Sequence, residues 1–144
     1  GEFDLVPGGC WYIPPAHTKS RREHVLPLTP MALELLLRYR ASQQAAGYRG
    51  VYLFPAASRQ GPIGSRDATR AVAAVSGRRW RAHDLRKLAR SRFTDQGTDH
   101  LVGEVILNHA MGKLAGIYIN SSMRDQMREA LSLYHDWLAE QGKQ

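Results

Sequence analysis

Five side chains in this sequence are of the types that can act together on one phosphate group. His83 and Arg86 stand three positions apart in the run His-Asp-Leu-Arg, and on a helix positions three apart share one face. Tyr118 follows His109 at a distance of nine residues, and Lys19 lies in a polar, turn-like stretch. Each of them alone also has an ordinary interpretation as a helix-end, core or surface side chain. Their combination is what indicates chemistry.

These residue types suit attack on a phosphodiester. A tyrosine phenol has a pKa of about 10, so Tyr118 needs help to act as a nucleophile at neutral pH. Arg86 can meet two phosphate oxygens with its planar guanidinium group. His83 and His109 can donate hydrogen bonds to the same group, and His83 is suited to moving the tyrosine proton. Electrostatics and proton transfer carry such a reaction, so we expect no metal ion and no cofactor.

The motifs resemble those of the tyrosine recombinase, or phage integrase, family. They stand in the order of that family, as Thr18-Lys19, His83-Asp84-Leu85-Arg86, Leu107-Asn108-His109 and Tyr118. The form Leu-Asn-His, with glycines at positions 112 and 116, is most similar to the prophage and genomic-island branch. The resemblance spans nearly the whole chain, from about residue 3 to residue 140.

The resemblance implies an activity, partners and a setting. The activity is site-specific DNA recombination, the integration or excision of a prophage or mobile element, through a 3′-phosphotyrosine link formed by Tyr118. Lys19 would give a proton to the departing 5′-hydroxyl. The implied partners are double-stranded DNA and other protomers of the same protein, without a membrane. The implied location is the bacterial cytoplasm.

One member of the family pattern has no counterpart here. The family has a further arginine at a helix start upstream of the hairpin lysine, whereas 18 residues precede Lys19 and none of them is an arginine. We therefore expect residues 1–144 to be a single, N-terminally truncated catalytic domain. Alone it should be a weak or inactive catalyst.

Charge and composition agree with a DNA partner. The 144 residues carry a formal charge of +7 and the isoelectric point is about 10.0, which favours a polyanionic partner. Seven basic residues lie between positions 78 and 92 with a single acid among them. The candidate DNA contacts among them are Arg78, Arg79, Arg81, Lys87 and Arg90. A single cysteine excludes an internal disulfide, and no apolar run is long enough to span a membrane.

The pattern of apolar residues predicts an α+β fold that is mainly helical. Strands at 10–13 and 24–28 form an N-terminal antiparallel hairpin or sheet beside a set of helices. The resemblance to tyrosine recombinases implies that the sheet packs on a helical catalytic core like that of DNA breaking-rejoining enzymes. Thr29 caps a helix that Gly47 ends, and Ser65 caps a helix that stops at Gly77. Later helices cover 83–96, the region of 101–107, and 122–141. The apolar stripe of the last helix fits its own core or a neighbouring protomer.

Three other functions remain open. A type IB topoisomerase-like enzyme uses the same chemistry, but the Leu-Asn-His element favours a recombinase. A non-catalytic DNA-binding module, such as a helix-turn-helix regulator, explains the basic helix but not Tyr118 at its spacing. A metal-dependent hydrolase would use His83, His100 and His109, whose spacing matches no familiar zinc pattern.

Overall fold

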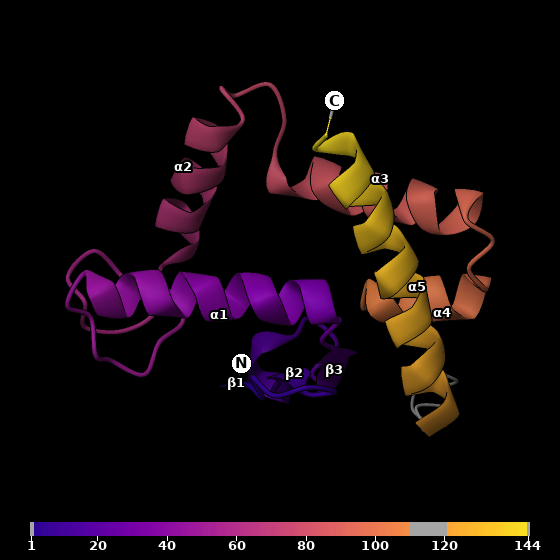
Figure 1. Cartoon of the computed structure of the whole chain (residues 1–144), viewed down its shortest axis with the longest axis horizontal. Coiled ribbons are helices and arrows are strands. Elements are labelled where there is room, and N and C mark those ends of the chain that lie inside the picture. The colour runs from indigo at the N-terminus through magenta and orange to yellow at the C-terminus, as the bar shows by residue number, and fades with distance from the viewer. Residues whose placement is uncertain (1, 110–120, 144) are drawn as a thin grey trace. The chain divides into compact units, whose positions relative to one another are not determined.

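The computed structural model describes residues 2–109 and 121–143. The chain divides into two compact units (Figure 1). The first contains the residues up to Leu36 and those from Ala89 onward, and the second contains Leu37–Leu88. Among the described residues there are five α-helices, a short 3-10 helix and one three-stranded sheet. The mainly helical α+β class predicted from the sequence is confirmed.

The sheet of the first unit has the order β1-β2-β3, and both pairs of strands are antiparallel. Strands β2 (Cys10–Ile13) and β3 (His24–Pro27) form the predicted hairpin, with Trp11 opposite Leu26. The sequence did not indicate β1 (Glu2–Phe3), which adds to the free edge of β2. Gly9 allows this addition, because a Cβ atom there would lie 2.0 Å from the carbonyl oxygen of Asp4.

Helix α1 (Pro30–Ala45) begins as its sequence predicts. The Thr29 hydroxyl accepts a hydrogen bond from the backbone N–H of Ala32 at 3.2 Å, and proline is favoured at the first helical position. Gly47 follows the helix with a φ of 81°, a left-handed conformation that suits glycine.

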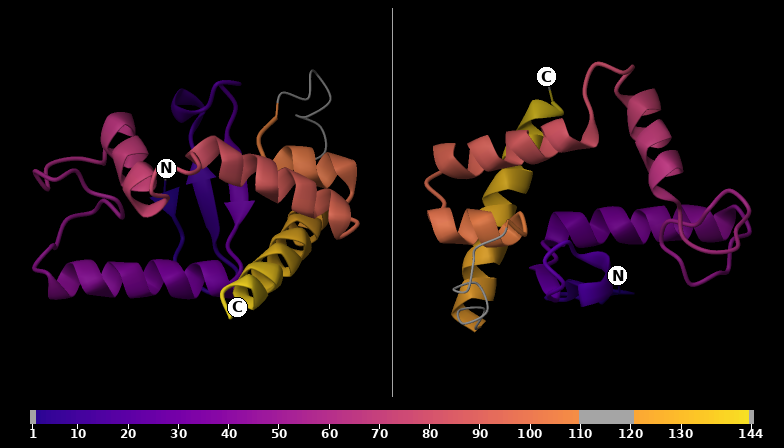
Figure 2. Two further views of the ribbon diagram at one scale, coloured as in Figure 1. Left: turned by 90° about the horizontal axis from the view of Figure 1, so that it is seen from above. Right: turned by 180° about the vertical axis from the view of Figure 1, so that it is seen from behind.

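The core of the first unit lies where three helices meet. They are α3 (Ala82–Asp95), α4 (His100–Ile106) and α5 (Ser121–Gln141). Figure 2 shows α4 beside α5, and these two helices pack against each other. Phe93 and Met127 are 1% and 0% exposed, respectively, at the centre of the cluster. Its other buried members are Val102, Val105, Ile106, Leu107, Met123 and Ala130.

This packing supports the first interpretation of the C-terminal helix, in which it packs on its own core. Met123, Met127 and Ala130 of α5 are buried in the core of their own unit, and Leu131 and Tyr134 pack against that core. The ring of Tyr134 meets Phe93 edge-on, with centroids 5.6 Å apart. The apolar stripe therefore serves the core of its own chain in this structure.

The second unit is built from the C-terminal part of α1, from α2 (Ser65–Val75) and from the first turns of α3. Within it the buried Gln43 donates from Nε2 to the carbonyl of Leu53 at 2.7 Å, and the ring of Tyr39 stacks on Phe54 with centroids 5.3 Å apart. One prediction is wrong here, because Gly64 rather than Ser65 occupies the cap of α2 and makes no side-chain cap. Ser65 is instead the first helical residue, so the extended backbone of Gly64 sets where α2 begins.

Candidate functional site

Lys19 lies in the turn between β2 and β3, in the first unit. A 3-10 helix (Pro15–His17) leads into the turn. The Thr18 hydroxyl donates to the carbonyl of Arg22 at 2.7 Å and accepts from the Arg22 N–H at 3.2 Å. These two hydrogen bonds close the turn around Lys19, whose side chain is exposed. The structure thus presents Lys19 to solvent at the hairpin tip, as the sequence predicts.

His83 and Arg86 lie in the first turns of α3, within the second unit. Asp84 secures this helix start, since its Oδ2 accepts from the backbone N–H of Arg81 at 3.0 Å. That hydrogen bond, followed by the contact with Lys87 at 3.4 Å, lowers the pKa of Asp84. Spacings of three and seven residues place His83, Arg86 and Arg90 along one face of this helix.

His109 is positioned by the way α4 ends. Asn108 adopts a left-handed φ of 50°, a conformation that glycine adopts freely and asparagine more readily than most other residues. Its N–H bonds the carbonyl of Val105 at 2.9 Å, and the N–H of His109 bonds the carbonyl of Glu104 at 3.0 Å. This pair of bonds is a Schellman motif, and it turns the chain back over the last turn of the helix. The Leu-Asn-His element therefore places His109 above Glu104.

The side chains of Glu104 and His109 are also bonded. The Nδ1 atom of His109 donates to Oε2 of Glu104 at 2.6 Å, and Nε of Arg90 donates to Oε1 at 2.6 Å. Arg90 further donates to Oγ1 of Thr94 and to Nδ1 of His100, each at 2.9 Å. We call Arg90, Glu104 and His109 the carboxylate clamp. It joins α3 and α4 within the first unit.

Charge keeps the carboxylate of the clamp ionised. The side chain of Glu104 is 17% exposed, and this burial by itself would raise the pKa of its carboxyl group. The hydrogen bonds and positive charges of His109 and Arg90 outweigh it, so the pKa of Glu104 is lowered. Sequence reasoning missed Glu104 altogether and assigned Arg90 to DNA contact. The only local signal is that Glu104 is the single acidic residue among the apolar residues of α4.

The predicted catalytic residues fall into three groups. Lys19 and His109 belong to the first unit, while His83 and Arg86 belong to the second. Tyr118 lies outside the described residues. The convergence of these five residues on one phosphate therefore stays a prediction.

The sequence profile of the phage integrase family matches residues 4–125 of the chain. The chain belongs to the phage integrase family. The matched region contains all five candidate catalytic positions, Lys19, His83, Arg86, His109 and Tyr118. Integrases of this family are tyrosine recombinases that bind DNA and carry out site-specific recombination. No curated protein and no solved structure matches the chain.

The positive charge of this integrase is concentrated in its second unit. Residues 37–88 contain eleven Lys and Arg and two Asp and Glu, a net charge of +9. The other 92 residues contain nine basic and eleven acidic residues, a net charge of −2. The candidate DNA contacts Arg78, Arg79, Arg81 and Lys87 lie in the positive unit and are exposed. Of the five candidates, Arg90 differs in being held by the carboxylate clamp.

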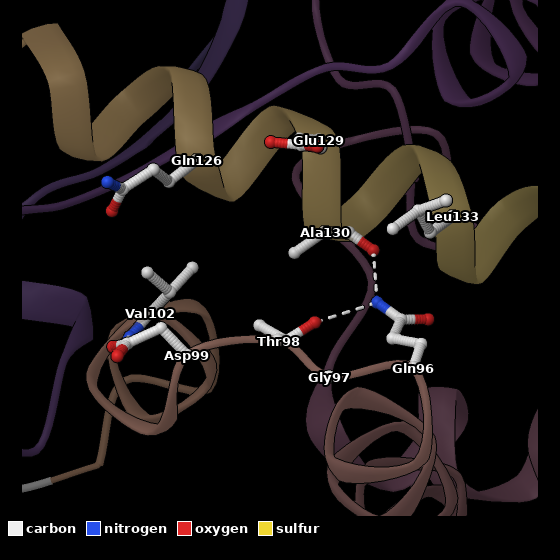
Figure 3. A pocket seen from close by; sticks show the side chains of 9 residues that line it. All are labelled: Gln96, Gly97, Thr98, Asp99, Val102, Gln126, Glu129, Ala130 and Leu133. Carbon is white, nitrogen blue, oxygen red and sulfur yellow. Dashed lines mark hydrogen bonds between the residues drawn. The ribbon is translucent and has the colours of Figure 1, made fainter.

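A surface pocket of the integrase belongs to the first unit, and none of the described candidate site residues lines it. The connection between α3 and α4 and the middle of α5 form its walls (Figure 3). Gln96 points across it and donates from Nε2 to the carbonyl of Ala130 at 2.8 Å and to Thr98 Oγ1 at 2.9 Å. These bonds tie the end of α3 to α5, so Gln96 has a structural role there.

Two other predictions concern metals and membranes. Within residues 2–109 and 121–143, no three His, Cys, Asp or Glu side chains lie close enough to hold a metal ion. His100, a ligand in the metal-hydrolase alternative, accepts from Arg90 instead. None of the helices that the structure describes is long and apolar enough to cross a membrane.

Proposed function

We propose that this integrase cuts and rejoins DNA through Tyr118 during the integration or excision of a prophage or related mobile element in bacteria. The phenolic oxygen attacks the scissile phosphorus, and the bond from phosphorus to the 5′ oxygen breaks. The product is a 3′-phosphotyrosine link that keeps the phosphoester for rejoining. The observation that carries the proposal is the family match over residues 4–125, together with His109 held at the end of α4, nine residues before Tyr118.

Each catalytic residue has a role that its chemistry supports. Arg86 binds two non-bridging oxygens of the phosphate. His83 takes the phenolic proton, and His109 contacts the phosphate as charge develops on it. Lys19, exposed at the hairpin tip, gives a proton to the departing 5′ oxygen. The protons balance: His83 gains the one that the tyrosine loses, and Lys19 loses the one that the 5′ oxygen gains.

The DNA is held by the positive unit. Exposed arginines that follow α2 neutralise backbone phosphates and release their counterions, which gives affinity without reading sequence. Further protomers complete the recombination complex on paired sites. The protein acts in the cytoplasm, where the chromosome is.

The decisive experiment traps the covalent link. The chain is incubated with a library of nicked duplexes of random sequence. In these duplexes the short strand between the cleaved bond and the nick leaves with a free 5′-hydroxyl and diffuses away, which prevents rejoining. Adducts that survive detergent are then isolated and their DNA is sequenced. We expect adducts with a preferred sequence, which disappear in Tyr118→Phe and persist in Tyr39→Phe, whose exposed ring is a matched control.

Other outcomes favour the alternatives. Adducts that persist in Tyr118→Phe would refute Tyr118 as the nucleophile. Binding without any adduct would favour a non-catalytic DNA-binding module. Relaxation of supercoiled DNA through adducts without sequence preference would favour a topoisomerase-like enzyme.

A further inference from the structure

The carboxylate clamp limits what the imidazole ring of His109 can do. An ionised carboxylate only accepts hydrogen bonds, so the 2.6 Å contact between Nδ1 and Oε2 of Glu104 requires a proton on Nδ1. The other carboxylate oxygen is taken by Nε of Arg90, also at 2.6 Å. An arginine side chain is a donor only and does not lose its proton in proteins. Glu104 therefore stands between two donors and has one oxygen for each.

The carboxylate itself is also held in place. Arg90 donates hydrogen bonds to three acceptors on α3 and α4, which are Glu104, Thr94 and His100. The backbone of His109 is tied to the same residue, through its N–H and the Glu104 carbonyl at 3.0 Å. Backbone and side-chain bonds thus fix both the position and the rotation of the ring. Functional histidines depend on such a partner, which sets the tautomer through the nitrogen that does not react.

We propose that Glu104, held by Arg90, is the positioning residue of His109: it keeps a proton on Nδ1 and makes Nε2 the nitrogen that exchanges a proton or hydrogen bond with the scissile phosphate. This inference rests on the proposed function for the identity of the phosphate. The state of the ring, however, is a property of the protein without DNA. In this proposal Arg90 acts as a part of the clamp, and its contact with DNA stays a prediction.

The tautomer of His109 provides a direct test. In Glu104→Gln one carboxylate oxygen becomes an amide NH₂ group. Because Arg90 remains a donor, the single amide oxygen turns to Arg90 and the NH₂ group faces His109. Nδ1 must then accept, so the proton of the neutral ring moves to Nε2. We expect two-dimensional ¹H–¹⁵N spectra of the ring to show the Nδ1–H form in the parent chain and the Nε2–H form in Glu104→Gln.

A second variant separates the clamp from a general effect of lost charge. In the double variant Glu104→Gln, Arg90→Met the amide oxygen no longer accepts a hydrogen bond from an arginine. It accepts from His109 instead, and the Nδ1–H form returns. Glu140→Gln removes the same charge from an exposed position of α5 and should leave the ring unchanged. Native-like backbone spectra of each variant show that it folds.

Covalent adduct formation tests the link to function. At saturating nicked DNA we expect Glu104→Gln to slow adduct formation about 10- to 100-fold, with DNA affinity within about twofold of the parent chain. If Glu104→Gln keeps the Nδ1–H form, or if the double variant does not regain it, then Glu104 does not set the tautomer of His109. A tautomer change without any loss of adduct rate would overturn the positioning role. Because the chain is expected to be a weak catalyst, adducts are collected over long incubations at high protein concentration. If the parent chain forms none under these conditions, the proposed function fails, while the spectra still decide the tautomer of His109.

Discussion

The hydroxyl of Thr29 lies 2.6 Å from Nδ1 of His135, so one contact joins the start of α1 to α5. Because this hydroxyl also accepts from the N–H of Ala32, its own proton is free to point at the imidazole. The hydroxyl also has a second lone pair, so this contact suits either tautomer of a neutral His135 ring. Burial lowers the pKa of His135, and the nearby charge of Asp136 opposes the shift only in part.

Acid should therefore weaken the fold through His135. The pKa of this group is lower in the folded state than the value of about 6.5 in an unfolded chain, so the unfolded state binds more protons as the pH falls below that value. The contribution of His135 is complete above about pH 6.5 and is lost toward its lower folded pKa. In urea unfolding followed from pH 8 to pH 5, His135→Asn should lose less stability than the parent chain. His17→Asn, at an exposed position, should show the same pH dependence as the parent.

The contact between Phe93 and the α5 core should dominate the stability of the first unit. Phe93 is 1% exposed and meets Tyr134 edge-on. Phe93→Ala should lower the free energy of unfolding by about 3–5 kcal/mol, because it removes apolar contacts and leaves a cavity. Leu133 lies next to Tyr134 on α5 but is 47% exposed. Leu133→Ala should therefore change the free energy of unfolding by less than about 0.5 kcal/mol. Equal effects in denaturant titrations would contradict the packing of α5 on this core.

The left-handed backbone of Asn108 predicts how substitutions at this position change the stability of the end of α4. Alanine is strained at a φ of 50°, and such strain costs about 1–2 kcal/mol. Asn108→Ala should therefore destabilise the end of α4 by about that amount, whereas Asn108→Gly should be neutral or slightly stabilising. Hydrogen exchange of the Asn108 and His109 amides provides the measurement, since these are the bonds that the turn makes. Identical exchange in the alanine and glycine variants would exclude a role for the φ angle.

The distribution of charge predicts how DNA binding responds to salt. Replacing Arg78, Arg79 and Arg81 with glutamine should reduce the slope of log affinity against log salt by about 1 for each phosphate that the variant no longer neutralises. The weakening should be similar for unrelated sequences, because backbone contacts carry no sequence information. A control with Arg124→Gln and Lys143→Gln removes exposed charge from the first unit and should leave most of the slope. Equal reductions in the two sets would indicate that the charged unit does not face DNA.

The sequence by itself determined those features that depend only on residues close together in the chain. Thr29 and Pro30 marked the start of α1, and Gly47 and Gly97 marked the ends of helices with positive φ angles. Two short apolar stretches around a polar, turn-like segment indicated the β2–β3 hairpin, and helical spacing of apolar residues indicated α5. The order of Lys19, His83, Arg86, His109 and Tyr118 indicated the family that the profile match then confirmed. These features follow from local propensities and from covalent spacing, which need no knowledge of distant contacts.

Only the tertiary structure decided which distant groups meet. The sequence allowed the apolar stripe of α5 to cover its own core or a neighbouring protomer. In the structure Met127 is buried in the same cluster as Phe93, so the stripe covers its own core. The pairing of Glu104 with Arg90, 14 positions away, follows no periodicity, because it depends on the packing of α4 against the end of α3. From the sequence, Arg90 was therefore one more basic residue in a basic helix. The type of each side chain follows from the sequence. Its partner depends on which helices pack against each other, and that packing exists only once the core has formed.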